Sequence, residues 1–155
     1  MQTVKIKNLI KTFGGTTAID NLSLDIEKGK ITGLIGADGS GKTTLIRLII
    51  GLLLPDSGEI DVLGLNPFTQ KNKLVSKIGY MPQKFGLYED LTVIENLRLY
   101  ADLKNQPYQF DKMLDFTSLT PFQERLAGAL SGGMKQKLGL ACTPVSYTHL
   151  TLPTI

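Results

Sequence analysis

The sequence predicts an α/β fold with antiparallel strands at one edge, a parallel sheet and a helical subdomain. Residues 3–10 and 18–26 alternate apolar and polar side chains, as antiparallel strands do when one face is exposed. Residues 30–36 lack this alternation and run into a glycine-rich loop, which is typical of a buried strand in a parallel sheet. The second half of the chain is mostly helical in pattern, and this order of elements indicates an α/β protein.

The elements after the glycine-rich loop follow from periodicity and from turn residues. A helical pattern runs from Lys42 to Leu53 and is predicted to end before Pro55. Residues 59–64 and 77–83 are short apolar stretches, and we predict a strand at each of them.

Three helices are predicted in the second half of the chain. Residues 92–103 place their apolar side chains on one helical face, and Thr92 and Glu95 form a capping-box pattern at its start. Residues 110–116 form a second helix, and a third begins near Ser131.

The composition is that of an ordinary globular chain. Of the 155 residues, 42% are apolar, and the net charge is +3 from 17 basic and 14 acidic residues. The basic residues are spread along the chain, so we expect no nucleic acid partner. The single cysteine, Cys142, excludes an internal disulfide and is expected to be a small apolar residue in a reducing compartment. The longest apolar run, residues 48–54, is far below the roughly 18 residues of a membrane span, so we expect a cytoplasmic chain.

The glycine-rich loop contains a phosphate-binding motif. Gly36 is followed by four residues and then by Gly41, Lys42 and Thr43, which matches the pattern G-x-x-x-x-G-K-[ST]. Backbone N–H groups can surround a phosphate chain only where the loop adopts conformations that side chains would block, and glycine permits them. The next helix directs its N-terminal amides at the anion. We expect Lys42 to reach the β- and γ-phosphates and Thr43 to bind Mg²⁺.

The predicted phosphate-binding residues are consecutive in the chain. They are Gly36, Ala37, Asp38, Gly39, Ser40, Gly41, Lys42, Thr43 and Thr44. Thr44 lies one residue deeper in the helix and is expected to contact the α-phosphate side. Phosphates would repel the Asp38 carboxylate, so we expect this side chain to cap the loop or to face a partner subunit.

Two other classes of phosphate-binding-loop protein are disfavoured. A GTPase should also contain D-x-x-G and N-K-x-D; residues 61–64 match the first pattern, and the second does not occur. A small-molecule kinase closes an arginine-bearing lid over its substrate. The three arginines of this chain, Arg47, Arg98 and Arg125, are scattered and lie in no lid-like loop.

A second motif indicates one particular family of phosphate-binding-loop proteins. Residues 130–136 read LSGGMKQ, the signature of ATP-binding-cassette (ABC) ATPases, and the chain resembles this family from about residue 4 to residue 142. Gln83 falls where the family has its Q-loop glutamine, and Phe13 where it has an aromatic residue that stacks on adenine. A strand-end cap at Gln83 and a strand-edge core position at Phe13 are the alternatives. Residues 80–103 resemble the ATP-binding subunits of bacterial ABC-2-type multidrug exporters.

The resemblance implies that the signature binds ATP held by another subunit. The residues concerned are Leu130, Ser131, Gly132, Gly133, Met134, Lys135 and Gln136. Ser131 is a natural N-cap, and the two glycines let backbone amides approach a γ-phosphate. The implied cofactors are ATP and Mg²⁺, with Thr43 and Gln83 at the metal.

The partners that the resemblance implies are a second ABC cassette, in a homodimer or in a tandem chain, and an ABC-2-type permease. Tyr88, Glu89 and Asp90 lie just beyond the Q-loop, where the family contacts its permease, although a solvated loop explains them equally well.

The last residues depart from the family pattern. The family has a Walker B aspartate and a catalytic glutamate after the signature, whereas this chain has no Asp or Glu after Cys142. Pro144 would also cut the signature helix short. Residues 144–155 read like a translated transposon-end adapter of sequencing libraries; a frameshifted remnant and a divergent C-terminus are the alternatives. We therefore expect a partial ABC domain at residues 1–143, incomplete at its C-terminus, with a helical insert at about 84–135 and a non-native tail.

The predicted function is ATP binding and, in the complete protein, ATP hydrolysis that powers export through an ABC-2-type permease. Such a subunit is peripheral on the cytoplasmic face of the inner membrane. The printed chain itself is expected to hydrolyse no ATP. The alternatives are a soluble ABC-type ATPase that acts on ribosomes or DNA, and a non-catalytic nucleotide-binding or inert fragment.

Overall fold

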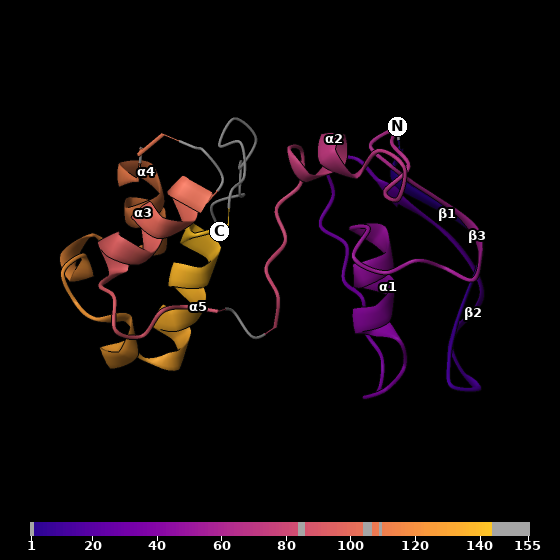
Figure 1. Cartoon of the computed structure of the whole chain (residues 1–155), viewed down its shortest axis with the longest axis horizontal. Helices are drawn as coiled ribbons and strands as arrows, with labels where there is room; N and C mark the ends of the chain where they lie inside the picture. The colour runs from indigo at the N-terminus through magenta and orange to yellow at the C-terminus, as the bar shows by residue number, and fades with distance from the viewer. Residues whose placement is uncertain (1, 84–85, 104–106, 109, 144–155) are drawn as a thin grey trace. The chain divides into compact units, whose positions relative to one another are not determined.

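The chain forms two compact units, Met1–Ile78 and Gly79–Ile155, each with its own hydrophobic core (Figure 1). The structure is a computed structural model that describes residues 2–83, 86–103, 107–108 and 110–143. The predicted non-native tail at residues 144–155 and Pro144 lie outside the described residues.

The first unit is built on a three-stranded antiparallel sheet in the order β2-β1-β3 (Figure 1). β1 (Gln2–Phe13) and β2 (Thr16–Glu27) form a hairpin, and β3 (Ser57–Val62) pairs with the other edge of β1. Buried Val4 and Ile6 alternate with exposed lysines along β1, so one face of the sheet is apolar. The strands predicted at residues 3–10 and 18–26 are confirmed, and the strand predicted at 59–64 is confirmed as far as Val62, after which Leu63 and Gly64 form a turn.

A helix of eight residues and one of five complete the described part of the first unit. α1 (Lys42–Ile49) packs Leu45 and Leu48 against the apolar face of the sheet. α2 (Lys71–Val75), which was not predicted, contributes the fully buried Leu74 to the same core. Because α1 begins directly after the phosphate-binding motif, its packing on the sheet fixes the position of that motif.

α1 was predicted to extend further, and this part of the prediction is wrong. The helix ends at Ile49 because Gly51 adopts a left-handed conformation with φ 72°. The N–H of Gly51 donates to the carbonyl of Leu48 at 3.1 Å, and the N–H of Leu52 donates to that of Arg47 at 2.9 Å. These two bonds form a Schellman motif, which satisfies the last carbonyls and turns the chain away from the helix axis.

Two predicted strands are wrong. Residues 30–36 and 77–83 form no strand, and the sheet in the described residues contains only antiparallel pairs. A strand of a parallel sheet needs a neighbour that pairs with its N–H and carbonyl groups, and no described strand flanks residues 30–36. Ile31 and Ile35 are consequently 85% and 96% exposed. The parallel sheet expected at the phosphate-binding loop is therefore absent from the described part of the chain.

The second unit is helical, as predicted. Its described residues form three α-helices and two short 3-10 turns: α3 (Val93–Leu103), α4 (Asp111–Thr117), η1 (Thr120–Phe122), η2 (Ala127–Ala129) and α5 (Gly132–Ala141). Their apolar faces meet in one core that includes Leu97, Leu114, Leu138 and Cys142. Cys142 is thus a buried apolar residue, as predicted. No helix in the described part of the chain is both long and apolar enough to span a membrane.

The capping box predicted at the start of α3 is confirmed. The N–H of Thr92 donates to Glu95 Oε2 at 2.8 Å, and the N–H of Glu95 donates to Thr92 Oγ1 at 3.2 Å. The bond from the Thr92 N–H stabilises the charged carboxylate and lowers the pKa of Glu95. These contacts satisfy two amides at the helix start and define where α3 begins.

Candidate nucleotide-binding site

The phosphate-binding loop is an exposed turn that leads directly into α1. Gly39 and Gly41 adopt left-handed conformations with φ of 78° and 85°. The N–H of Ser40 donates to the carbonyl of Ala37 at 3.2 Å and closes the turn between them. Gly41 is the N-cap of α1, and no side chain caps this helix start. The first amides of α1 are therefore not capped by a side chain and can bind an anion.

Gly41 also anchors the loop on the sheet. A Cβ at this position would lie 2.3 Å from the Ala18 carbonyl oxygen and 3.1 Å from Ile19 Cδ1, both in β2. Only a glycine allows the loop backbone to approach β2 this closely. The hairpin of the first unit therefore determines where the start of α1 lies.

Lys42 places its charge against the loop that precedes it. Its Nζ donates to the carbonyls of Gly36 at 2.7 Å and Ala37 at 2.5 Å, and lies 3.4 Å from Ser40 Oγ. An ammonium group held beside uncapped helix amides is a donor set that suits a phosphate chain. Thr43, the next residue, is exposed and can offer its hydroxyl to a cation on that phosphate. The residues present thus fit a magnesium-bound triphosphate.

Asp38 lies exposed in the loop. Among the described residues, no N–H of the loop donates to its carboxylate, so the structure does not support its interpretation as a loop cap. The second interpretation, that Asp38 faces a partner subunit, stays a prediction.

Phe13 lies in the same unit as the phosphate-binding loop, at the end of β1. It pairs with Thr16 across the hairpin turn, and its side chain is 47% exposed. Lys11 Nζ lies 5.3 Å from the centroid of the ring. A ring this exposed is not part of the core, and it has free surface on which a base can stack.

Asp56, which no sequence motif indicated, binds the end of β1. Its carboxylate accepts hydrogen bonds from Lys11 Nζ at 2.7 Å, from the Thr12 N–H at 2.6 Å and from Thr12 Oγ1 at 2.7 Å. The bond from Lys11 is the main cause that lowers the pKa of Asp56 to about 2, and the bonds from Thr12 add to it. Asp56 follows a turn proline and is 44 residues from Thr12 in sequence, so no local pattern pointed to this pair.

The signature motif lies in the second unit, at the start of α5. Ser131 Oγ accepts a hydrogen bond from the Met134 N–H at 3.3 Å, which confirms Ser131 as the predicted N-cap. Gly132 and Gly133 are exposed, and a Cβ at either would meet nothing within 4 Å. Leu130, in contrast, is buried in the core. One flank of the motif is thus anchored while its glycines face open space.

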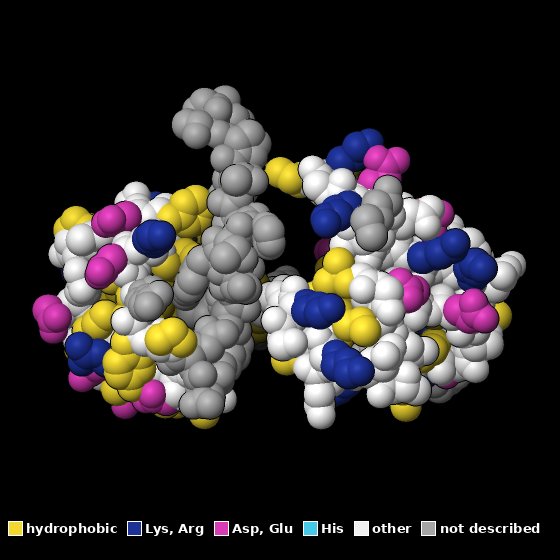
Figure 2. All heavy atoms as spheres, turned by 90° about the horizontal axis from the view of Figure 1, so that it is seen from above, with side chains coloured by type: hydrophobic (Ala, Val, Ile, Leu, Met, Phe, Trp, Pro, Cys, Tyr) yellow, Lys and Arg dark blue, Asp and Glu magenta, His cyan; other side chains and the backbone are white. Residues whose placement is uncertain are grey.

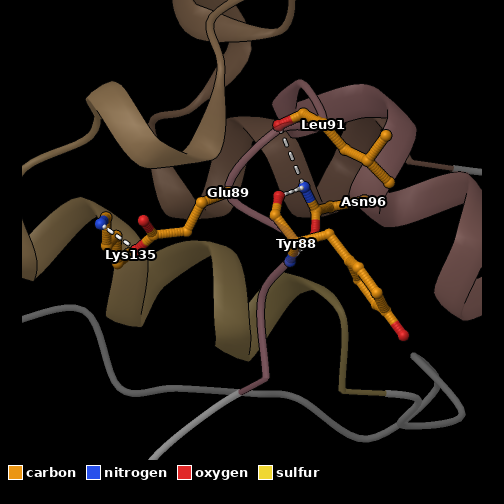
Figure 3. A network of polar contacts seen from close by, with 5 residues as sticks. All are labelled: Tyr88, Glu89, Leu91, Asn96 and Lys135. Atoms are coloured by element: carbon orange, nitrogen blue, oxygen red, sulfur yellow. Dashed lines mark hydrogen bonds and ion pairs between the residues drawn. The ribbon is translucent and has the colours of Figure 1, made fainter.

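The loop at residues 88–92 is fixed to the signature helix and to α3 (Figure 3). Asn96, buried in α3, accepts a bond from the Tyr88 N–H at 3.0 Å and donates to the Tyr88 carbonyl at 2.9 Å. Glu89 Oε1 accepts a bond from Lys135 Nζ at 2.6 Å, and the Glu89 carbonyl accepts one from the Gly128 N–H at 2.9 Å. The role of Asn96 could not be recognised from the sequence, because a single polar residue on an apolar helix face forms no motif.

The predicted site residues therefore fall into two groups. Phe13 and residues 36–44 belong to the first unit, whereas Gln83 and residues 130–136 belong to the second. Gln83 is exposed, and its role at Mg²⁺ stays a prediction.

In the view of Figure 2, each unit carries exposed charged side chains of both signs.

Comparisons with known proteins agree with the two motifs. Residues 19–152 match the family model described as ABC transporter. The chain is 54% identical to YbhF of Escherichia coli, named a probable multidrug ABC transporter ATP-binding protein, over 96% of this chain and 27% of that protein. It is 34% identical to BcrA of Bacillus licheniformis, a bacitracin transport ATP-binding protein, over 96% of this chain and 49% of that protein.

A solved structure of the ATP-binding subunit of an ABC transporter is 27% identical and superimposes with a TM-score of 0.77, covering 91% of this chain and 61% of the other. The chain thus spans between about a quarter and a half of the length of these two curated relatives. The family model covers most of the chain, including both glycine-rich motifs. The chain belongs to the ABC transporter family and contains part of its ATPase domain.

Proposed function

We propose that residues 36–44 bind the triphosphate of Mg²⁺-ATP and that Phe13 stacks on its adenine. The observation that supports this best is the ammonium group of Lys42, which lies against the loop carbonyls beside the uncapped start of α1. A γ-phosphate offers this group charged oxygens in place of neutral carbonyls, and charge-assisted hydrogen bonds are the stronger ones. Thr43 would hold Mg²⁺ through its hydroxyl, and Gln83 would complete the metal site.

The signature motif, in this proposal, binds ATP held by a second cassette. Gly132 and Gly133 have open space around them, so packing within the chain does not require them to be glycine. Glycine in a helix costs about 1 kcal/mol relative to alanine. A ligand that approaches the backbone from outside explains why two glycines occur together at this helix start.

In the complete protein, the proposed outcome of ATP hydrolysis is export through an ABC-2-type permease at the cytoplasmic face of the inner membrane. The 54% identity to YbhF, which is named a probable multidrug ABC transporter ATP-binding protein, supports an exporter. Residues 88–90 would contact the permease, and the ion pair between Glu89 and Lys135 of α5 would link that contact to the signature. This chain has no Asp or Glu side chain after Cys142 that could position the attacking water or bind Mg²⁺. We therefore propose that it binds ATP without hydrolysing it.

The experiment compares the 155-residue chain with its Lys42→Ala variant in equilibrium binding of ATP in the presence of Mg²⁺. Loss of a charged donor to phosphate predicts an affinity lower by a factor of about 10 to 100. Lys28→Ala, which removes an exposed lysine of the same unit, is the matched control and should bind as the parent does. Equal affinities of the Lys42→Ala variant and the parent would contradict the proposal.

A further inference from the structure

The end of β1 is held by Asp56, which lies in the turn before β3. Three donors of β1 converge on its carboxylate, and the Asp56 N–H donates to the Ile10 carbonyl at 2.9 Å. The Lys11 side chain is only 14% exposed, so its ammonium group has little freedom to leave this ion pair. A carboxylate with three donors fixes both the backbone at Thr12 and the charge of Lys11.

The Lys11 ammonium group that Asp56 binds also lies over the Phe13 ring. The distance from Nζ to the ring centroid is 5.3 Å, within the range in which a cation is attracted by the face of an aromatic ring. Lys11 and Phe13 are two residues apart near the end of β1, and this contact shows that their side chains lie on the same side of the chain. The carboxylate, the ammonium group and the ring therefore form a chain of three contacts.

The Phe13 ring lies outside the hydrophobic core of the first unit and is about half exposed. The hairpin turn that follows Phe13 consists of Gly14 and Gly15, and a Cβ at either would meet nothing within 4 Å. The ring itself is exposed rather than packed in the core. Without Lys11 the ring would lose this contact, and a binding base would have to order it at a greater entropic cost.

We infer that Asp56 and Lys11 are positioning residues, which hold the Phe13 ring ready to stack on the base of a purine nucleotide. Asp56 acts through Lys11, and neither residue needs to touch the phosphates. The inference rests on the proposed function, because it assumes that Phe13 meets the base. It predicts that both residues matter for a ligand with a base and not for a bare phosphate chain.

The experiment measures two dissociation constants for each variant of the full chain, one for ATP and one for inorganic triphosphate, both with Mg²⁺. Phe13→Ala should weaken ATP binding about tenfold, as expected for loss of one stacked base. Lys11→Met, which keeps an unbranched side chain but removes the charge, and Asp56→Asn should each weaken it about threefold. Triphosphate affinity should stay within about twofold of the parent in every case. Asp61→Asn is the matched control, because Asp61 lies on β3 opposite Lys5 in the strand register, away from the end of β1 that Asp56 binds.

The outcomes separate this inference from the proposed function. If Phe13→Ala weakens ATP binding while Lys11→Met and Asp56→Asn do not, the inference is overturned and the adenine site stands. If Phe13→Ala has no effect, the adenine site fails and the inference with it. If Lys11→Met and Asp56→Asn weaken ATP and triphosphate equally, these residues support the unit as a whole, which also overturns a positioning role.

Discussion

The two glycine-rich helix starts of this chain use glycine for different reasons. At the start of α1, Gly41 has a left-handed φ, and a Cβ there would collide with the backbone of β2. At the start of α5, Gly132 and Gly133 have no positive φ, and their surroundings are open. Ser131 caps α5 with its side chain, whereas no side chain caps α1. The fold itself demands glycine at the first site and does not demand it at the second.

This difference distinguishes a glycine that the fold requires from a glycine that only a bound ligand would require. A glycine that the chain needs would be found there whether or not a ligand binds. A glycine that the chain does not need costs stability, so a contact from outside is the simplest physical reason for its presence. The same comparison predicts that glycine-to-alanine substitutions at the two sites change stability in opposite directions.

The largest effect is expected for Gly41→Ala. The left-handed conformation and the collision with the Ala18 carbonyl together should lower the free energy of unfolding by about 3 kcal/mol. Gly39→Ala is the matched control, because Gly39 has a similar φ but no atom within 4 Å of its Cβ position. Its cost should be only about 1 kcal/mol. Urea unfolding followed by far-ultraviolet circular dichroism measures both, and equal costs would show that the contact with β2 is unimportant.

An intermediate effect is expected for Ser131→Ala. Removal of the hydroxyl leaves the Met134 N–H without its cap and should lower the free energy of unfolding by about 1 kcal/mol. Ser131→Asn keeps a capping oxygen and should retain most of the stability. The same urea titration applies. A Ser131→Ala variant as stable as the parent would mean that the cap contributes nothing, and the contrast between the two helix starts would weaken.

The smallest effect is expected for Gly133→Ala. This substitution should stabilise the protein, whereas Gly41→Ala and Ser131→Ala should destabilise it. Alanine is the better helix former and meets no neighbour here, so the free energy of unfolding should rise by about 0.5 kcal/mol. Thermal unfolding compares this variant with the parent and with Gly41→Ala. A loss of stability in Gly133→Ala would show that the chain itself needs this glycine, and the argument for an external ligand at α5 would lose its basis.

Features governed by neighbours in sequence were predictable. The strands at residues 3–10 and 18–26, the capping box of Thr92 and Glu95 and the N-cap at Ser131 depend on local alternation or on bonds within three residues. The phosphate-binding motif is local in the same way, because one short loop supplies the glycines, the lysine and the start of α1. The family followed from two such motifs in the right order.

Features that depend on distant partners were not predictable. Residues 30–36 have the composition of a buried strand, but an extended segment becomes a strand only when another strand pairs with it. The early end of α1 is a turn at Gly51, whose Cβ position lies 2.4 Å from the Pro67 carbonyl oxygen, and the sequence does not reveal that contact.

The sequence by itself determined the two glycine-rich motifs of this protein, each at a helix start, and through them its family. The tertiary structure decided which distant groups contact these regions. Asp56 reaches Lys11 across 45 residues, and Glu89 reaches Lys135 across 46. The physical reason is range: caps and turns are formed by atoms a few bonds away, whereas the ion pairs that orient a site are formed by whichever side chains the folded core brings together.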